Sequence, residues 1–211
     1  MPEMPNARSL KEKQRQEREQ LILQVTEEVL LEKGYHEMSM DEIAARVGIA
    51  KGTLYLHFAR KEDLVFALID RELQVFQQTV EEAIAMDGTV QSRLAFIQRS
   101  MYLGLFGKRA HLLYALFNTA DLRLVLGERH GAARKQIASR IEMLLNEGKE
   151  RGELDPTVPT EVMQSTFMCM LSPLAYKHLV FSGKMTSEEL VHYIERIYFR
   201  GIAAQAAPMG E

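Results

Sequence analysis

Residues Ser39 to Phe58 read SMDEIAARVGIAKGTLYLHF, a pattern that predicts two short helices joined by a tight turn. Ser39 is a favourable N-cap, and Glu42, three residues later, completes a capping box. The apolar residues of the first helix recur at the spacing of one helix face: Met40, Ile43, Ala44 and Val47. Gly48 then ends this helix, because glycine readily adopts the left-handed conformation found just after a helix. A second helix is expected to begin near Ala50, which makes the stretch a helix-turn-helix.

The second of these helices has an apolar face and an opposite face that is free for recognition. Ala50, Leu54 and Phe58 share the apolar face. Gly52 and Leu56 lie opposite. A glycine inside a helix costs about 1 kcal/mol relative to alanine, so Gly52 is better explained where a backbone approaches another molecule. In a helix-turn-helix that molecule is DNA, read in its major groove. The alternative is an ordinary corner between two helices with a solvated outer face.

A resemblance to a known family bears on this choice. The stretch from Met38 to Asp63 resembles the DNA-binding domain of the TetR (tetracycline-repressor-like) family of bacterial transcription regulators. The matching pieces are Gly34-Tyr35, Ser39-Met40-Asp41-Glu42-Ile43-Ala44, Val47-Gly48-Ile49, Lys51-Gly52-Thr53-Leu54-Tyr55, His57-Phe58 and Lys61-Glu62-Asp63-Leu64. Two positions depart from the commonest pattern of the family. Ala50 stands where serine is frequent, and Leu56 stands where a second tyrosine is frequent. A contact from Leu56 is therefore expected to be apolar, for example to a thymine methyl group.

The resemblance implies a set of DNA contacts centred on the second helix of the motif. It further implies that Thr26, on the wetter side of the preceding helix, and Lys61, just after the motif, reach phosphates. The predicted DNA-binding residues are Thr26, Ser39, Met40, Ala50, Lys51, Gly52, Thr53, Tyr55, Leu56, His57 and Lys61.

The chain as a whole has the composition of a globular protein, since 46% of its 211 residues are hydrophobic and 26% are charged. No apolar run is long enough to span a membrane, and the charged N-terminal residues contain no apolar signal segment. The single cysteine, Cys169, cannot form an internal disulfide and is predicted to be a buried structural thiol. These features favour a cytoplasmic protein.

The net charge of −3 is unusual for a protein that binds DNA, and acidic side chains slightly outnumber basic ones even in the first 64 residues. Affinity for DNA comes largely from cations placed on phosphates rather than from bulk charge. The basic residues must therefore be concentrated locally, and a dimer must double their contacts. We expect operator affinity to fall as salt rises, with a modest slope.

Residues 1–18 are predicted to form an N-terminal arm, which has two interpretations. It is either a solvated, partly disordered lead-in, or a basic arm that touches phosphates or the neighbouring minor groove. The basic residues of that arm are Lys11, Lys13, Arg15 and Arg18. A helix over about 17–33, ended by Gly34, is predicted to complete a three-helix core with the helix-turn-helix pair.

Beyond the motif the pattern is helical, and no stretch alternates with period two for long enough to form a strand. Helices are predicted over 63–85, 90–106, 108–118, 121–150, 159–182 and 186–203. The last of these begins with a capping box formed by Thr186 and Glu189. The sequence thus predicts an all-α fold of about nine helices. Its parts are a three-helix DNA-binding domain over 19–64, a helical ligand-binding and dimerisation domain over 65–204, and a frayed tail over 205–211.

The two C-terminal helices are predicted to form the dimer interface. The helix over 159–182 is apolar on more than one face, so it must be buried from two sides. The helices of two chains would form a four-helix bundle with twofold contacts, as the resembled family does. The alternative is a central helix in a monomeric core. The predicted interface residues are Phe167, Leu171, Leu174, His178, Phe181, Tyr193 and Ile197.

Residues 90–181 are predicted to enclose the pocket of a small effector. Aromatic and methionine side chains at helical spacing suit either a plain core or an apolar pocket, and the polar groups among them would orient the ligand. The predicted ligand-binding residues are Phe96, Arg99, Met101, Arg109, His111, Tyr114, Phe117, Asn118, Met163, Phe167 and Met170. The effector is expected to be largely apolar, with an anionic head such as that of an acyl-coenzyme A as one option.

No catalytic residues, metal ligands or cofactor are predicted, because the histidines lack ligand spacing and no glycine loop for phosphate is present. The predicted function is a homodimeric repressor. It binds a pseudo-palindromic DNA operator, with its two recognition helices about one DNA turn apart, and the effector releases it. An activator, or a regulator of the same fold that responds to a protein partner, is the alternative.

Overall fold

The computed structural model describes residues 7–104, 129–171, 176, 178–179 and 182–203. These residues contain eight helices and, apart from one isolated bridge between Leu154 and Ala203, no β structure. The predicted all-α class is confirmed. The described residues divide into two compact units between Arg71 and Glu72, whereas the sequence placed the boundary between residues 64 and 65.

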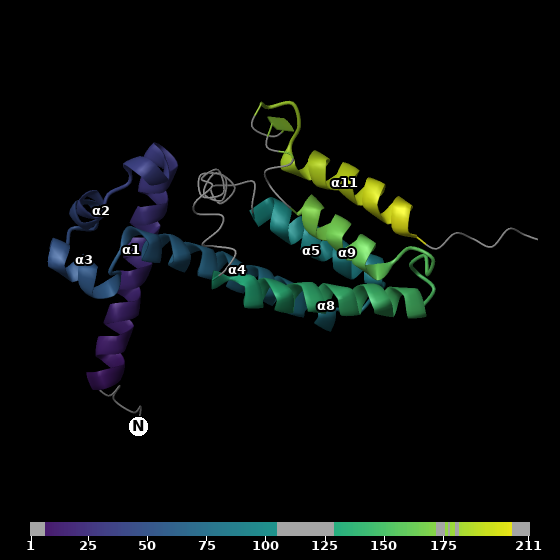
Figure 1. Ribbon diagram of the computed structural model, residues 1–211, viewed down its shortest axis with the longest axis horizontal. Coiled ribbons are helices and arrows are strands. Elements are labelled where there is room, and N and C mark those ends of the chain that lie inside the picture. The colour runs from purple at the N-terminus through teal and green to yellow at the C-terminus, as the bar shows by residue number, and fades with distance from the viewer. Residues whose placement is uncertain (1–6, 105–128, 172–175, 177, 180–181, 204–211) are drawn as a thin grey trace, which may run out of the picture. The chain divides into compact units, whose positions relative to one another are not determined.

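The first unit is built on a long helix, α1 (Ala7–Glu37). Two short helices, α2 (Met40–Val47) and α3 (Lys51–His57), pack on one side of it, and α4 (Lys61–Ala85) begins after a short turn (Figure 1). Leu21, the first residue of the α1 stripe predicted from the sequence, is 45% exposed and lies outside the core of this unit, whereas Val25 and Val29 are buried. The buried residues are Ile22, Val25, Val29, Leu30, Ile43, Ala44, Leu54, Leu64 and Leu68.

The N-terminal end of α1 differs from its prediction. The helix begins at Ala7 rather than near residue 17, so residues 7–18 are not a disordered lead-in. This segment is rich in lysine, arginine, glutamate and glutamine, which are all strong helix formers. Pairs at i and i+4, such as Arg15 with Glu19 (3.1 Å), add support on its surface. At the other end Gly34 interrupts the helical geometry with φ 77° and ψ 172°, as predicted from its residue type.

The caps of α2 follow the sequence in part. The Ser39 hydroxyl accepts a hydrogen bond from the Glu42 backbone N–H (3.3 Å), and Gly48 takes the left-handed conformation at φ 76°. The other half of the predicted capping box is absent from this structure. The Glu42 carboxylate instead accepts bonds from Lys33 (2.7 Å) and Arg46 (2.8 Å), because two cations offer stronger partners than one backbone N–H.

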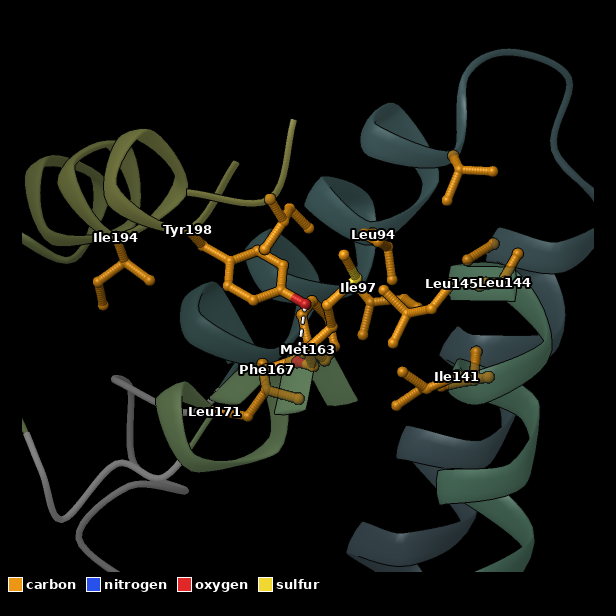
Figure 2. Close-up of a cluster of buried hydrophobic side chains, with 14 of the residues drawn as sticks. Leu94, Ile97, Ile141, Leu144, Leu145, Met163, Phe167, Leu171, Ile194 and Tyr198 are labelled. Atoms are coloured by element: carbon orange, nitrogen blue, oxygen red, sulfur yellow. Dashed lines mark hydrogen bonds between the residues drawn. The ribbon is translucent and has the colours of Figure 1, made fainter. Parts of the chain in front are cut away.

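The second unit combines the rest of α4 with α5 (Val90–Gly104), α8 (Gly131–Glu150), α9 (Thr160–Met170) and α11 (Ser187–Ile202). Helix α5 packs against α8 and α11, and α9 packs against the same two helices. Apolar side chains from all four helices meet in one core, where the Tyr198 hydroxyl donates to the Met163 carbonyl at 2.9 Å (Figure 2).

Two of the predicted helices in this unit have different bounds. The helix predicted over 121–150 is interrupted at His130, which lies in a turn just before α8. The helix predicted over 159–182 ends at Met170. Pro173 lies just beyond, and proline both lacks a backbone N–H and disfavours helical geometry in the residue before it. Helix α5 is described as far as Gly104, and the end of its predicted range (105–106) and the predicted helix over 108–118 lie outside the described residues.

Two further sequence predictions can be compared with this unit. The capping box of Thr186 and Glu189 is confirmed, with both of its hydrogen bonds present. The prediction for Cys169 is wrong, because its side chain is exposed. Helix α9 is apolar overall, but this position faces outward, which composition alone does not reveal. Among the helices of the described ranges, none is long and apolar enough to cross a membrane.

Candidate nucleic-acid interface

The outer face of α3 carries Leu56, which has the highest exposure of the large hydrophobic side chains in the described residues. Leu56 is 82% exposed and Tyr55 is 43% exposed, while Lys51 and Gly52 beside them are also exposed. Leu54 on the opposite face is fully buried and fixes the orientation of the helix. A leucine with this exposure gains nothing from the fold of its own chain. The face is therefore available for a partner.

No steric constraint within the described chain requires a glycine at position 52. A Cβ atom added there would meet nothing within 4 Å, and the backbone lies in the ordinary helical region. Alanine would thus be the better helix former at this position. Gly148 in α8 shows the contrast, since a Cβ there would lie 2.7 Å from the Leu154 side chain. The open space at Gly52 is consistent with close approach by a molecule outside the chain.

Lys51, the first residue of α3, is held by α2. Its ammonium group lies 2.6 Å from the Asp41 carboxylate, and both side chains are largely exposed. The hydrogen bond to Asp41 raises the pKa of Lys51. This pair orients the lysine beside the helix start. Because both charges are in water, a phosphate can compete with Asp41 at little cost.

His57, the last residue of α3, is largely covered and does not face outward. Its Nδ1 atom lies 3.0 Å from the Glu19 carboxylate on α1, and Arg15 bonds to the same carboxylate oxygen at 3.1 Å. Burial raises the pKa of Glu19, but the hydrogen bonds from His57 and Arg15 outweigh burial and leave that pKa below its ordinary value. His57 therefore ties α3 to α1, and its predicted role as a direct DNA contact is secondary to this bond.

A groove of about 320 Å³ lies where the N-terminal part of α1 runs beside the end of α3. Lys11, Gln14, Arg15 and Arg18 line it from α1, and Leu56 and His57 line it from α3. Lys11 and Arg18 have no ion-pair partner among the residues that the structure describes. The groove thus joins two uncommitted cations to the exposed end of α3. We call it the α1–α3 groove.

Other cations of the first unit are neutralised by neighbouring acids. Arg46 bonds to Glu32 (2.7 Å) as well as to Glu42, and Arg71 bonds to Glu27 (2.6 Å). Several acidic side chains of this unit are therefore neutralised in ion pairs that lie away from α3. The local charge beside α3 is more positive than the sum over the domain.

Lys61 is half-buried and partly committed. Its ammonium group lies 4.2 Å from the centre of the Tyr35 ring and donates to the His36 carbonyl (3.3 Å). Burial lowers the pKa of Lys61. Burial and the hydrogen bond to Glu62 raise the pKa of Tyr35 to about 12. Tyr35, which is half-buried and donates to the Glu62 carboxylate at 2.9 Å, thus holds Lys61.

Two predicted DNA contacts lie inside the first unit. Thr26 was expected on the wetter side of α1, but it is fully buried and its hydroxyl donates to the Ile22 carbonyl (2.7 Å). The stripe of α1 is wide enough to include it, so the predicted orientation is wrong. Met40 is 8% exposed and belongs to the core, which leaves only its backbone at the start of α2 for a contact. Ser39, Ala50 and Thr53 remain accessible.

The predicted effector residues in the second unit fall into three groups. Met163 and Phe167 are core residues, and the Phe167 ring packs 5.5 Å from Tyr198; Phe96, Met101 and Met170 border the same core and are partly buried. Arg99 is exposed and bonds to Glu195 (2.7 Å). Arg109, His111, Tyr114, Phe117 and Asn118 lie outside the described residues.

The predicted dimer residues also divide. Tyr193 (47%) and Ile197 (72%) are exposed on α11, and His178 is exposed. Phe167 and Leu171 are covered by their own chain, at 0% and 6% exposure. Their placement at the interface is therefore wrong, because the apolar faces of α9 are used by the core of this unit. Leu174 and Phe181 lie outside the described residues.

Helix-turn-helix geometry with an exposed second helix defines a DNA-binding domain. The sequence model described as "Bacterial regulatory proteins, tetR family" matches residues 22–68. The chain belongs to the TetR family of transcriptional regulators.

Relatives support this assignment beyond the motif. The chain is 28% identical to the fatty acid metabolism regulator protein of Bacillus subtilis over 142 residues. This match covers 67% of this chain and 73% of that protein. The chain is 36% identical over 80 residues to the transcriptional activator FasR of Mycolicibacterium smegmatis, or 38% of this chain and 36% of FasR. The crystal structure of FadR from Bacillus subtilis in complex with stearoyl-CoA has a TM-score of 0.72 at 23% identity, covering 87% of this chain and 98% of that one.

Proposed function

We propose that this regulator is a homodimeric repressor that binds a pseudo-palindromic operator and is released by a small, largely apolar effector. The observation that carries the DNA-binding step is the outer face of α3, where Leu56 is 82% exposed and Gly52 opens the backbone to close approach. Lys51 stands beside them with a charge that a phosphate can recruit. Such a protein acts on chromosomal DNA, which places it in the cytoplasm.

The α1–α3 groove extends this surface. Lys11 and Arg18 are free to meet the phosphates that flank the bases read by α3. The basic-arm interpretation thus takes a helical form, since these cations are carried by α1 and not by a flexible segment.

Binding to DNA is tested by fluorescence anisotropy with a labelled duplex from the region just upstream of the protein's own coding sequence. We expect a saturable complex that an excess of unrelated duplex does not remove. Leu56→Ala should weaken the complex several-fold, since it removes an apolar contact to a base edge. A Met143→Ala control removes an exposed (56%) apolar side chain from α8 and should have no effect. Equal affinity for operator and unrelated DNA in the unmodified protein would sink the proposal.

Dimerisation is proposed from the exposed apolar side chains of α11. Tyr193 and Ile197 stand one helical turn apart, so they share one face of the helix. A 72% exposed isoleucine is better explained by a second copy that covers it, as in the twofold bundles of the resembled family. Light scattering on the intact protein is expected to give twice the chain mass of 24.1 kDa.

The release step is proposed from the relatives and from the character of the second unit. FadR from Bacillus subtilis was crystallised with stearoyl-CoA, and a relative from the same organism is a fatty acid metabolism regulator. We infer that a fatty-acyl molecule is the effector class to test first. Helix α4 runs through both units without a break and is the element through which ligand binding would alter DNA binding. Only a ligand with different affinities for the two states can do this.

The second candidate is activation of transcription. The relative FasR is an activator, and it matches this chain through 80 residues at 36% identity. Both candidates require the same DNA-binding face. A reporter gene behind the upstream region separates them, because deletion of the regulator raises expression for a repressor and lowers it for an activator.

A further inference from the structure

Gln98 in α5 is a fully buried amide that has no hydrogen-bond partner among the described residues. Its side chain has 0% exposure, and neither its Oε1 nor its Nε2 atom has a hydrogen-bond partner in the part of the chain that the structure describes. Leu94 and Tyr102 lie one turn before and one turn after it, and both are also fully buried. Residues four apart share one face of a helix, so Gln98 faces the interior of the second unit.

Other buried polar side chains of the second unit have partners. Arg93 is 4% exposed and bonds to Glu147 at 2.6 Å. The Tyr198 hydroxyl donates to the Met163 carbonyl, and the Thr79 hydroxyl donates to the Val75 carbonyl at 2.9 Å. On the same helix as Gln98, the Gln91 amide donates to the Glu153 carbonyl at 3.4 Å. Gln98 differs because both of its polar atoms are unpaired.

Folded proteins pair nearly all of their buried polar groups, so an unpaired amide in the interior indicates a bound molecule that completes it. A planar amide offers one acceptor and two donors, and it is best matched by a group that has both a donor and an acceptor. Another amide has both. A carboxylate only accepts, and it would leave Oε1 unpaired.

Charges near this position also disfavour a carboxylate. Arg99 follows Gln98 in the chain, but its side chain is 62% exposed and its guanidinium bonds to Glu195 through two hydrogen bonds of 2.7 and 2.8 Å. This cation is directed to α11 and the solvent. Among the described residues, Arg99 therefore offers no free cation to a buried anion beside Gln98, and such an anion requires one.

We propose that Gln98 anchors an amide group of the effector, whose apolar body lies among the surrounding core side chains. This inference rests on the proposed function, since it names the chemistry of the effector. Two sources supply such a group to an acyl chain: the pantetheine arm of an acyl-coenzyme A, and the amide of a fatty acid. Gln98 is a specificity-determining residue in this view, because it selects an amide over a carboxylate.

The first test is the stability of the full chain without ligand. Gln98→Met replaces the amide by an apolar side chain of similar size, so it is expected to raise the Tm by about 2–4 °C. Gln91→Met is the matched control on the same helix. Its amide is partnered, so the Tm should stay or fall. A lower Tm for Gln98→Met would mean that the amide has a partner in the folded chain, and it would overturn the inference.

The second test is binding of three ten-carbon probes: decanoyl-coenzyme A, decanamide and decanoate. The side-chain NH₂ signals of Gln98 are assigned in a ¹⁵N spectrum as those lost in Gln98→Met. We expect decanamide to shift them and to bind more tightly than decanoate. Gln98→Met should bind decanamide about tenfold more weakly, with decanoate unaffected. Decanoyl-coenzyme A shifting the same signals identifies the pantetheine source, and decanamide alone identifies the fatty-acid amide.

If no probe moves these signals, the amide is bonded by a buried water only, and the inference is overturned. Operator binding is measured separately and needs no ligand. Loss of operator binding with intact amide recognition would overturn the proposed function and leave the role of Gln98 standing. Intact operator binding without amide recognition would overturn the proposed role of Gln98 and leave the DNA-binding proposal standing.

Discussion

At the scale of a residue, substitution of Gly52 is expected to affect stability and DNA affinity in opposite directions. The open space around it means that alanine fits, and a helical glycine is less stable than alanine by about 1 kcal/mol. Gly52→Ala should therefore raise the free energy of unfolding by up to about 1 kcal/mol, while operator affinity falls at least several-fold because the methyl group blocks approach to DNA. Urea unfolding and anisotropy measure the two effects.

Gly131 supplies the control for this substitution. It also lies in a helix with open space for a Cβ atom, but it belongs to α8. Gly131→Ala should stabilise the protein without changing operator affinity. If Gly52→Ala bound the operator as tightly as the unmodified protein, the α3 backbone would not approach DNA.

Thr26 gives a second prediction at this scale. Its hydroxyl is buried and bonds within α1, so Thr26→Val keeps the shape of the side chain and loses only one local hydrogen bond. The free energy of unfolding should change by no more than about 1 kcal/mol, and operator affinity should stay the same. A marked loss of affinity would restore the phosphate contact that the resemblance implied.

The sequence identified individual residues well where one local interaction decides their conformation. Ser39, Gly48 and Thr186 each do what their residue types favour, because a cap depends on the few atoms next to it. Glu42 does not, since Lys33 from α1 and Arg46 from the next turn of α2 compete for its carboxylate. Gln98 could not be identified in advance, because an unpaired amide is defined by everything that surrounds it.

At the scale of an element, the N-terminal extension of α1 makes a specific contribution to binding. Lys11 and Arg18 line the α1–α3 groove without ion-pair partners in the described chain, so each is expected to neutralise a phosphate. The double variant Lys11→Gln, Arg18→Gln should bind all duplexes more weakly. In a plot of log affinity against log salt concentration, the magnitude of its negative slope should decrease by about 2 for each bound chain.

Lys13 is the matched control for these cations. It lies on the same stretch of α1, but it is outside the groove, is 73% exposed and pairs with Glu17 (4.0 Å). Lys13→Gln should leave both affinity and slope nearly unchanged. An equal loss from Lys13→Gln would assign the effect to general charge and not to the groove.

Helix boundaries show why the elements were only partly predictable. The apolar stripe of α1 was predicted in part, since Val25 and Val29 are buried but Leu21 is 45% exposed. The polar extension of α1 from Ala7 has no apolar pattern and was assigned to an arm. The end of α9 at Met170 was missed because the apolar pattern continues past Pro173, and periodicity records faces and not backbone breaks. The wrong placement of Phe167 at the dimer interface has a similar cause, because core and interface helices have the same apolar composition.

At the scale of the molecule, the weak net charge and the exposed face of α11 lead to one combined prediction. The chain has a net charge of −3 and some cations of its first unit are held in ion pairs, so tight binding is expected to require two copies on one operator. Ile197→Asp places a charge on the face that a second copy is proposed to cover, and its exposure of 72% means that the single chain tolerates it. The variant should have the mass of one chain by light scattering.

Its operator affinity should then fall by at least about a hundredfold, and its salt slope should drop to about half, because one set of phosphate contacts remains. Met143→Asp controls for an added charge, since Met143 is 56% exposed on α8 and lies outside the proposed interface. A monomeric Ile197→Asp variant with an unchanged slope would show that a single chain makes all the phosphate contacts. In that case the acidic balance of the domain would have to be offset within one copy, by Lys51 and the free cations of the α1–α3 groove.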